Sequence, residues 1–253
     1  MDIICFKIWI QNKIVMKKFQ HSFFVFFIFV LFSQNCFSQT DSNKVDEKGK
    51  KHGVWKGFYE ASKRPRYEGT FEHGKEIGIF YFYDDTKAKS LLATREFNSK
   101  DNVAYTIFYD QKGNKVSEGK VINKLFEGQW KYYHQASKLI MTTENYSKGK
   151  LEGLRTVFYL SGKIAEEINY KNNVKNGFYK KYTENGFLLE ESTFKEGNYI
   201  GTAIFRDSKG NTVSKGQFVN GKKAGIWQFF ENGKITKEIN MSFPENATKS
   251  DNN

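Results

Sequence analysis

The feature that most constrains this chain is an internal repeat of about 24 residues. The stretch G-Q-W-K-Y-Y at residues 128–133 returns as G-I-W-Q-F-F at residues 225–230. With the glycine as position zero, the pattern recurs at intervals of 24 to 26 residues, at Gly53, Gly78, Ala104, Gly128, Gly153, Gly177, Gly201 and Gly225. Such a period indicates a repeat architecture, in which each unit packs mainly on its neighbours.

Each repeat contains two chain reversals, and these predict two strands per repeat. Turn pairs such as S-G at 161–162 and N-G at 185–186 alternate with K-G-K at 148–150 and N-G-K at 220–222. Glycine and asparagine accept the positive φ angles of tight hairpins, and the segments between them are rich in Tyr, Phe, Val, Ile and Thr. We therefore predict an all-β, elongated, single-layer antiparallel sheet of tandem β-hairpin repeats, with about eight repeats and about sixteen strands.

Two positions in each repeat differ in how uniform they are. Position five is aromatic in seven of the eight copies: Phe58, Tyr83, Tyr109, Tyr133, Phe158, Tyr182 and Phe230. Large flat side chains bury much area when they stack along a sheet, so we interpret these residues as structural. The register glycines are expected where a neighbouring ring or backbone must come close.

Position two is more variable, and side-chain alternation places it on the face opposite to position five. It holds Thr106 and Ala203 in two copies, and in the other six it holds Trp55, Phe80, Trp130, Arg155, Tyr179 and Trp227. A face that meets an irregular partner varies between copies, and Trp, Tyr and Arg often anchor interfaces. These six are our candidate partner-binding residues. The alternative is that they only cover the sheet.

The repeat resembles the MORN repeat variant, which is used by the YwqK-like antitoxin family of bacterial proteins. Glu68 with Phe71 and Glu191 with Phe194 match its E-x-x-aromatic half, while Gly128, Trp130 and Tyr133 match its glycine-aromatic half. The resemblance covers residues 49–241, implies hairpins laid side by side in one sheet, and implies no particular activity. The third and seventh copies are degenerate, so their hairpins are the doubtful ones.

The flanking segments indicate export. Residues 1–15 look like an over-extended start, and residues 16–38 have the basic, apolar and small-residue order of a signal peptide cut before Gln39. Residues 39–48 are predicted as a polar linker and residues 242–253 as a disordered polar tail. No transmembrane segment is expected after signal removal. The protein would then lie in the periplasm, on the cell surface or outside the cell, with lipidation at Cys36 as an alternative to simple cleavage.

No cluster of residues suggests catalysis, a metal or a cofactor. His52, His73 and His134 are separated in sequence and are interpreted as solvated loop residues. The periodic glutamates, such as Glu118 and Glu167, are interpreted as a cross-strand charge ladder, because a catalytic pair is needed only once. We therefore predict that the protein is not an enzyme.

The charge of the exported chain is positive but dispersed. Removal of residues 1–38 leaves 36 basic and 27 acidic side chains, a net charge of +9. Because lysines and glutamates are interleaved and the chain is exported, nucleic acid is not an expected partner. A protein, a glycan or an anionic envelope surface is expected instead.

Two functions from different classes follow. The first is an exported, monomeric, non-catalytic scaffold that binds a protein or the envelope surface. The alternative is an antitoxin or immunity protein that neutralises a toxin, which a neighbouring toxin gene would support.

Overall fold

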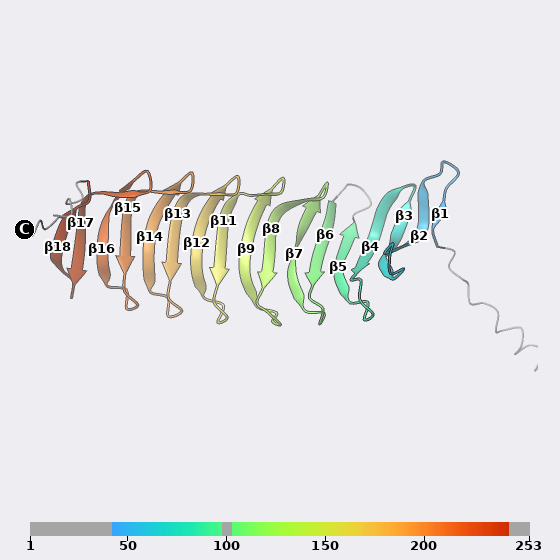
Figure 1. Cartoon of the computed structure of the whole chain (residues 1–253), viewed down its shortest axis with the longest axis horizontal. Helices are drawn as coiled ribbons and strands as arrows, with labels where there is room; N and C mark the ends of the chain where they lie inside the picture. The colour runs from blue at the N-terminus through green and yellow to red at the C-terminus, as the bar shows by residue number, and fades with distance from the viewer. Residues whose placement is uncertain (1–41, 98–102, 243–253) are drawn as a thin grey trace, which may run out of the picture.

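The computed structural model describes residues 42–97 and 103–242 (Figure 1). The predicted start, signal peptide and first part of the linker lie outside these ranges, as does the tail beyond Ser242. The described residues form eighteen strands in one open antiparallel sheet and contain no helix. They accordingly include no helix that has the length and apolarity to cross a membrane. The predicted all-β, single-sheet fold is confirmed.

The strands follow one another along the sheet in chain order. The N-terminal half contains β1 (Lys44–Val45), β2 (Lys51–Phe58), β3 (Pro65–Glu72), β4 (Lys75–Tyr83), β5 (Leu91–Phe97), β6 (Val103–Tyr109), β7 (Lys115–Ile122), β8 (Leu125–Tyr133) and β9 (Ile140–Ser147). The C-terminal half contains β10 (Lys150–Leu151), β11 (Gly153–Phe158), β12 (Ile164–Lys171), β13 (Val174–Tyr182), β14 (Leu188–Lys195), β15 (Asn198–Arg206), β16 (Thr212–Val219), β17 (Lys222–Glu231) and β18 (Lys234–Asn240). Figure 1 shows them side by side from β1 to β18, with the hairpin turns along the two long margins of the sheet.

Two very short strands account for the difference from the sixteen that were expected. Strands β10 and β11 are parts of one strand interrupted at Glu152, and both pair with β9. Strand β1 lies within the predicted linker, where Lys44 pairs with His52 and Val45 with Lys51. The prediction of a linker through residue 48 is therefore wrong at its C-terminal end.

This N-terminal segment covers the outer edge of β2. The backbone N–H of Asn43 donates to the Val54 carbonyl at 2.8 Å. The Asn43 side chain donates to the Lys56 carbonyl at 3.0 Å and accepts the Lys56 N–H at 2.7 Å, as another strand would do. An uncovered sheet edge is a template for unwanted pairing, so residues 43–45 protect this end of the sheet.

All seven register glycines adopt a positive φ. Gly128 has a φ of 67°, and the pairing of β7 with β8 slips nearby, between Glu118 and Lys120. A side chain at Gly128 would meet no atom within 4 Å, so the backbone angle is what requires glycine there. Ala104 takes the same position in β6, and the β5–β6 pairing is regular through it. The expectation that register glycines make room for a ring is thus wrong for Gly128.

The two degenerate copies still form hairpins. Strand β6 pairs with β7 from Val103 to Tyr109, and β15 pairs with β16 from Gly201 to Arg206. Each turn is closed by an aspartate, since Gly113 N–H donates to the Asp110 carbonyl at 2.9 Å and Gly210 N–H to the Asp207 carbonyl at 3.0 Å. The hairpins closed by these two turns therefore form although the repeat positions differ. The Asp101–Asn102 turn, where the third copy lacks the usual glycine, lies outside the described residues.

Candidate interaction surface

Side chains alternate between the two faces of the sheet, and the faces differ in burial. The packed face carries position two of every repeat, and Phe80, Trp130 and Trp227 on it have no exposed surface. The open face carries positions one and three, and Ile79 and Tyr105 on it are 45% and 43% exposed. The two faces therefore have different roles.

Trp130 shows how a single-layer sheet buries a large ring. Its indole lies on the backbone of Gly119 in the neighbouring strand, where an added Cβ would come within 2.6 Å of three ring atoms. It stacks on Phe126 at a centroid distance of 3.7 Å, and its Nε1 donates to the Lys120 carbonyl at 3.0 Å. Trp227 repeats the arrangement over Gly216. These glycines, and not the register glycines, make room for a ring.

Position two is therefore the core of the sheet, which corrects the assignment of the candidate binding residues. Phe80, Trp130, Tyr179 and Trp227 are buried, while Trp55 and Arg155 are half-buried. The small residues Thr106 and Ala203 are buried as well, each between two repeats with a larger residue. Each of these two small residues has large position-two residues in the repeats on both sides, which help to fill the space along the sheet. The variability of position two reflects this packing, so the buried residues are not accessible to a partner.

Position five forms hydrogen bonds across the open face. The Tyr133 hydroxyl donates to the Glu118 carboxylate, which also pairs with Lys115 at 2.9 Å. The Tyr182 hydroxyl donates to Glu167 at 2.9 Å. In the seventh copy Arg206 replaces the aromatic residue and pairs with Glu191 at 3.4 Å. The periodic glutamates therefore do pair across strands. Phe58, at the N-terminal end, is 52% exposed.

These contacts shift the pKa values of both partners. Burial and then the hydrogen bond to Glu167 raise the pKa of Tyr182 to about 12. Burial alone would raise the pKa of Glu118, but the hydrogen bonds from Tyr133 and Lys115 outweigh it and lower the pKa. The tyrosines therefore remain neutral donors and Glu118 remains an ionised acceptor near neutral pH.

The packed face contains one polar network that the repeat does not reproduce. Arg155, on β11, replaces the aromatic ring of its copy and lies between two carboxylates. Its Nε donates to Glu144 on β9 at 2.9 Å, and another guanidinium nitrogen donates to Glu166 on β12 at 3.1 Å. The Tyr146 hydroxyl donates to Glu144 at 2.6 Å, and the Tyr179 hydroxyl donates to Glu166 at 3.1 Å.

Each carboxylate in this network has both a cation and a hydroxyl as donors. The half-buried network is thus a closed set of donors and acceptors, which offsets the cost of placing a charged arginine among aromatic side chains. Sequence reasoning found no non-repeated polar cluster, because these residues come from four strands. The signal available was Arg155 itself, which breaks the aromatic pattern.

The open face exposes a cluster of large apolar residues on β4 and β6. Ile79 and Tyr81 lie on β4, where Tyr81 is 39% exposed, and Tyr105 lies on β6. Glu96, on the intervening strand β5, pairs with both Ile79 and Tyr105. Sequence reasoning missed this cluster because it compared positions two and five only. Position one, which also holds the exposed Phe178 and Ile226, was the signal that could have revealed it.

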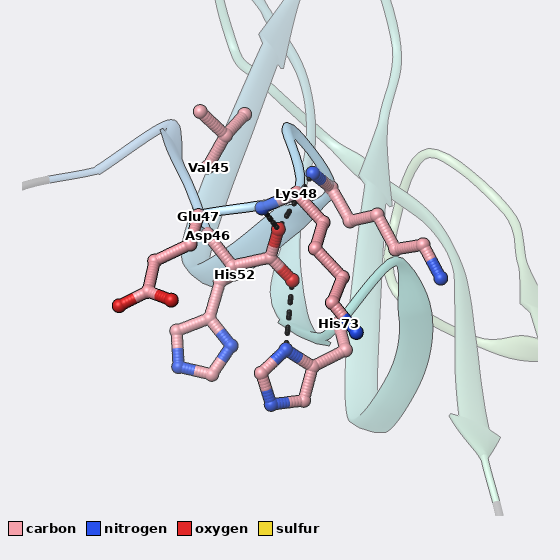
Figure 2. Close-up of a pocket in the computed structure, with 7 residues that line it drawn as sticks. Val45, Asp46, Glu47, Lys48, His52 and His73 are labelled. Carbon is pink, nitrogen blue, oxygen red and sulfur yellow. Dashed lines mark hydrogen bonds and ion pairs between the residues drawn. The ribbon is translucent and has the colours of Figure 1, made fainter.

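A pocket of about 600 Å³ lies at the N-terminal end of the sheet (Figure 2). It is lined by Val45, Asp46, Glu47, Lys48, Lys50, His52 and His73. The structure brings together two of the three histidines that the sequence separates. His134 lies elsewhere, with its Nε2 at 3.2 Å from the Phe158 carbonyl.

Comparison with known families supports the repeat. Residues 151–172 match the family model of the MORN repeat variant. This segment covers β11, β12 and the turn between them, which is one repeat hairpin of the sheet. No match was found among curated proteins. A MORN-type repeat and a sheet built of repeated hairpins fit a non-catalytic binding module.

Proposed function

We propose that this protein is an exported, non-catalytic repeat scaffold that binds a protein partner along its open face. The observation that carries the proposal is the cluster formed by Ile79, Tyr81 and Tyr105. Their strands pair with neighbours on both sides, yet these side chains are exposed on the open face. Exposed apolar side chains that gather on one face mark interaction surfaces, and tyrosine is enriched in such surfaces.

A protein surface fits this cluster better than an anionic glycan or an anionic envelope surface does. Glu96 lies between the apolar residues, and its carboxylate would repel an anionic polymer at the centre of the site. An aliphatic side chain such as Ile79 contributes no hydrogen bond to a sugar but gains from contact with apolar protein side chains. The expected partner therefore presents an apolar patch with a cationic or donor group opposite Glu96.

Export and the lack of catalysis are supported by the sequence. The order of residues in 16–38 supports secretion. N-terminal sequencing of the exported form should start at Gln39, and retention of residues 19–31 would contradict cleavage of a signal peptide. The paired state of the Arg155 network supports a structural role for its carboxylates. The antitoxin alternative rests on the family resemblance, and no contact among the described residues favours it.

Site-specific photo-crosslinking in the native cells tests the binding face. A photoreactive residue at Tyr81 should give a discrete adduct, whereas one at Leu160, a 60% exposed turn residue, should not. The adduct at Tyr81 should disappear when Ile79→Lys is added. Equal adducts from both positions, or none from Tyr81, would contradict the proposal.

A further inference from the structure

The N-terminal pocket places two imidazole rings next to each other. His52 lies on β2 and His73 lies in the turn between β3 and β4, 21 positions later in the chain. Their ring centroids are 4.8 Å apart with an interplanar angle of 37°. Figure 2 shows the two rings side by side beneath Asp46, and both side chains are exposed.

Asp46 fixes the orientation of one of these rings. Its Oδ2 lies 2.7 Å from His73 Nδ1. Its Oδ1 accepts the backbone N–H groups of Lys48 and Lys50, both at 2.9 Å. With both oxygens of Asp46 placed as acceptors, the ring N–H of His73 is assigned to Nδ1, which leaves Nε2 of the neutral ring with a free lone pair.

This arrangement is the one that surrounds histidine ligands of metals. A metal-binding histidine almost always donates its other ring N–H to a carboxylate or carbonyl, which fixes the tautomer and increases ligand basicity. The imidazole spacing agrees as well. With Zn–N bonds of about 2.0–2.1 Å, two imidazoles on one ion place their ring centres roughly 4.5–5.2 Å apart at N–Zn–N angles of about 90–109°. The observed 4.8 Å lies within this range.

We propose that His52 and His73 form a two-imidazole site for a borderline divalent transition ion such as Zn²⁺ or Ni²⁺, with Asp46 as the orienting carboxylate. Imidazole suits these ions, whereas oxygen ligands suit Mg²⁺ and Ca²⁺. Within the described ranges, no set of three or more histidine, cysteine or carboxylate side chains is arranged around one ion. The protein therefore supplies two ligands, and water completes the coordination.

The charges around the site are balanced. Asp46 and Glu47 offset Lys48 and Lys50, which line the same pocket. Selectivity must therefore come from the imidazoles and not from a surplus of carboxylates. Because His52 and His73 belong to β2 and to the turn after β3, a shared ion would link the first two hairpins of the sheet. This inference does not depend on the proposed protein-binding face.

Calorimetric titration of tag-free protein with Zn²⁺, Ni²⁺ and Mg²⁺ tests the site. Wild-type protein should bind one Zn²⁺ or Ni²⁺ and no Mg²⁺. His52→Ala and His73→Ala should each weaken binding by at least about tenfold, since even an outer-shell partner of a ligand is typically worth 10–100-fold. Asp46→Asn should weaken it by a similar factor. His134→Ala is the matched control and should bind like wild type.

Both histidines are exposed, so both variants are expected to fold, which circular dichroism of each variant checks. Zn²⁺ should also raise the unfolding temperature of wild type and not that of His73→Ala, because an ion that binds only the folded state stabilises it. The proposal is overturned if wild type binds neither Zn²⁺ nor Ni²⁺, or if binding is unchanged in both histidine variants. Equal affinity for Mg²⁺ would also overturn it, because it would indicate a carboxylate site.

Discussion

Replacement of Trp130 by alanine distinguishes a core residue from a binding residue. The side chain has no exposed surface, and it packs on Phe126 and on the backbone of Gly119. The change removes the ring from the centre of the packed face and leaves the Lys120 carbonyl without its indole donor. The neighbouring backbone cannot collapse fully into the space because both adjacent strands are held by the sheet.

The expected loss can be worked from the buried area. A buried aromatic side chain removes about 150–250 Å² from water, which at about 25 cal/mol per Å² corresponds to roughly 4–6 kcal/mol. Alanine keeps its Cβ and the unfolded chain is partly compact, so the real loss is smaller. We expect Trp130→Ala to lower the free energy of unfolding by about 3–5 kcal/mol, as for other buried aromatic residues.

Urea unfolding followed by circular dichroism measures this loss without relying on tryptophan fluorescence. Tyr81→Ala is the matched control, because Tyr81 is a large aromatic residue on the opposite face and is 39% exposed. It should cost about 1 kcal/mol or less, close to the value for ordinary surface substitutions. If Trp130→Ala cost less than Tyr81→Ala, the assignment of the two faces would be wrong.

Three further predictions concern particular contacts. Gly119→Ala should destabilise the protein by about 1–3 kcal/mol, because its Cβ would overlap the Trp130 ring. Gly128→Ala should cost about 1–2 kcal/mol through its positive φ alone. Urea midpoints of both variants, each combined with Trp130→Ala, separate the two causes, because only the Gly119 penalty should vanish when the ring is absent. Arg155→Ala should lower the free energy of unfolding by roughly 1–3 kcal/mol, because Glu144 and Glu166 both lose their cation. This loss lies between the values typical of exposed and of fully buried ion pairs, and an unchanged urea midpoint would count against the network. The pKa of Glu118 in the folded state lies below the ordinary glutamate value of 4.5, so the stability that it contributes is present above that pH and is lost as the pH falls through the lowered pKa. Wild type should therefore lose stability below about pH 4.5 more steeply than Glu118→Gln does, and equal pH profiles would refute this.

The architecture could be predicted from sequence because it depends on local signals. The glycine and asparagine turns fix where the chain reverses, and the constant spacing of position five fixes the strands between them. Even the degenerate third copy follows the rule, since the turn at Asp110–Gly113 closes normally. Local turn chemistry and side-chain alternation are sufficient for a sheet in which every strand pairs with its neighbour in sequence.

The role of each face could not be predicted, because burial depends on contacts between repeats. Trp130 is buried because Gly119, on another strand, offers it a flat surface, and Ala203 is buried because its neighbours are large. The variability of position two was therefore interpreted as adaptation to an irregular partner, whereas it reflects packing between repeats. The Arg155 network and the His52–His73 pair depend on register across strands, and residues brought together in this way have no signature in a single segment.

Hydroxyl-radical footprinting read by mass spectrometry tests the central claim most directly, namely that the sheet has one packed face and one open face. The account predicts fast modification of Tyr81 and Tyr105 and almost none of Trp130 and Trp227, although a free indole reacts readily. Rapid modification of both tryptophans, with Tyr81 and Tyr105 protected in the isolated protein, would contradict it.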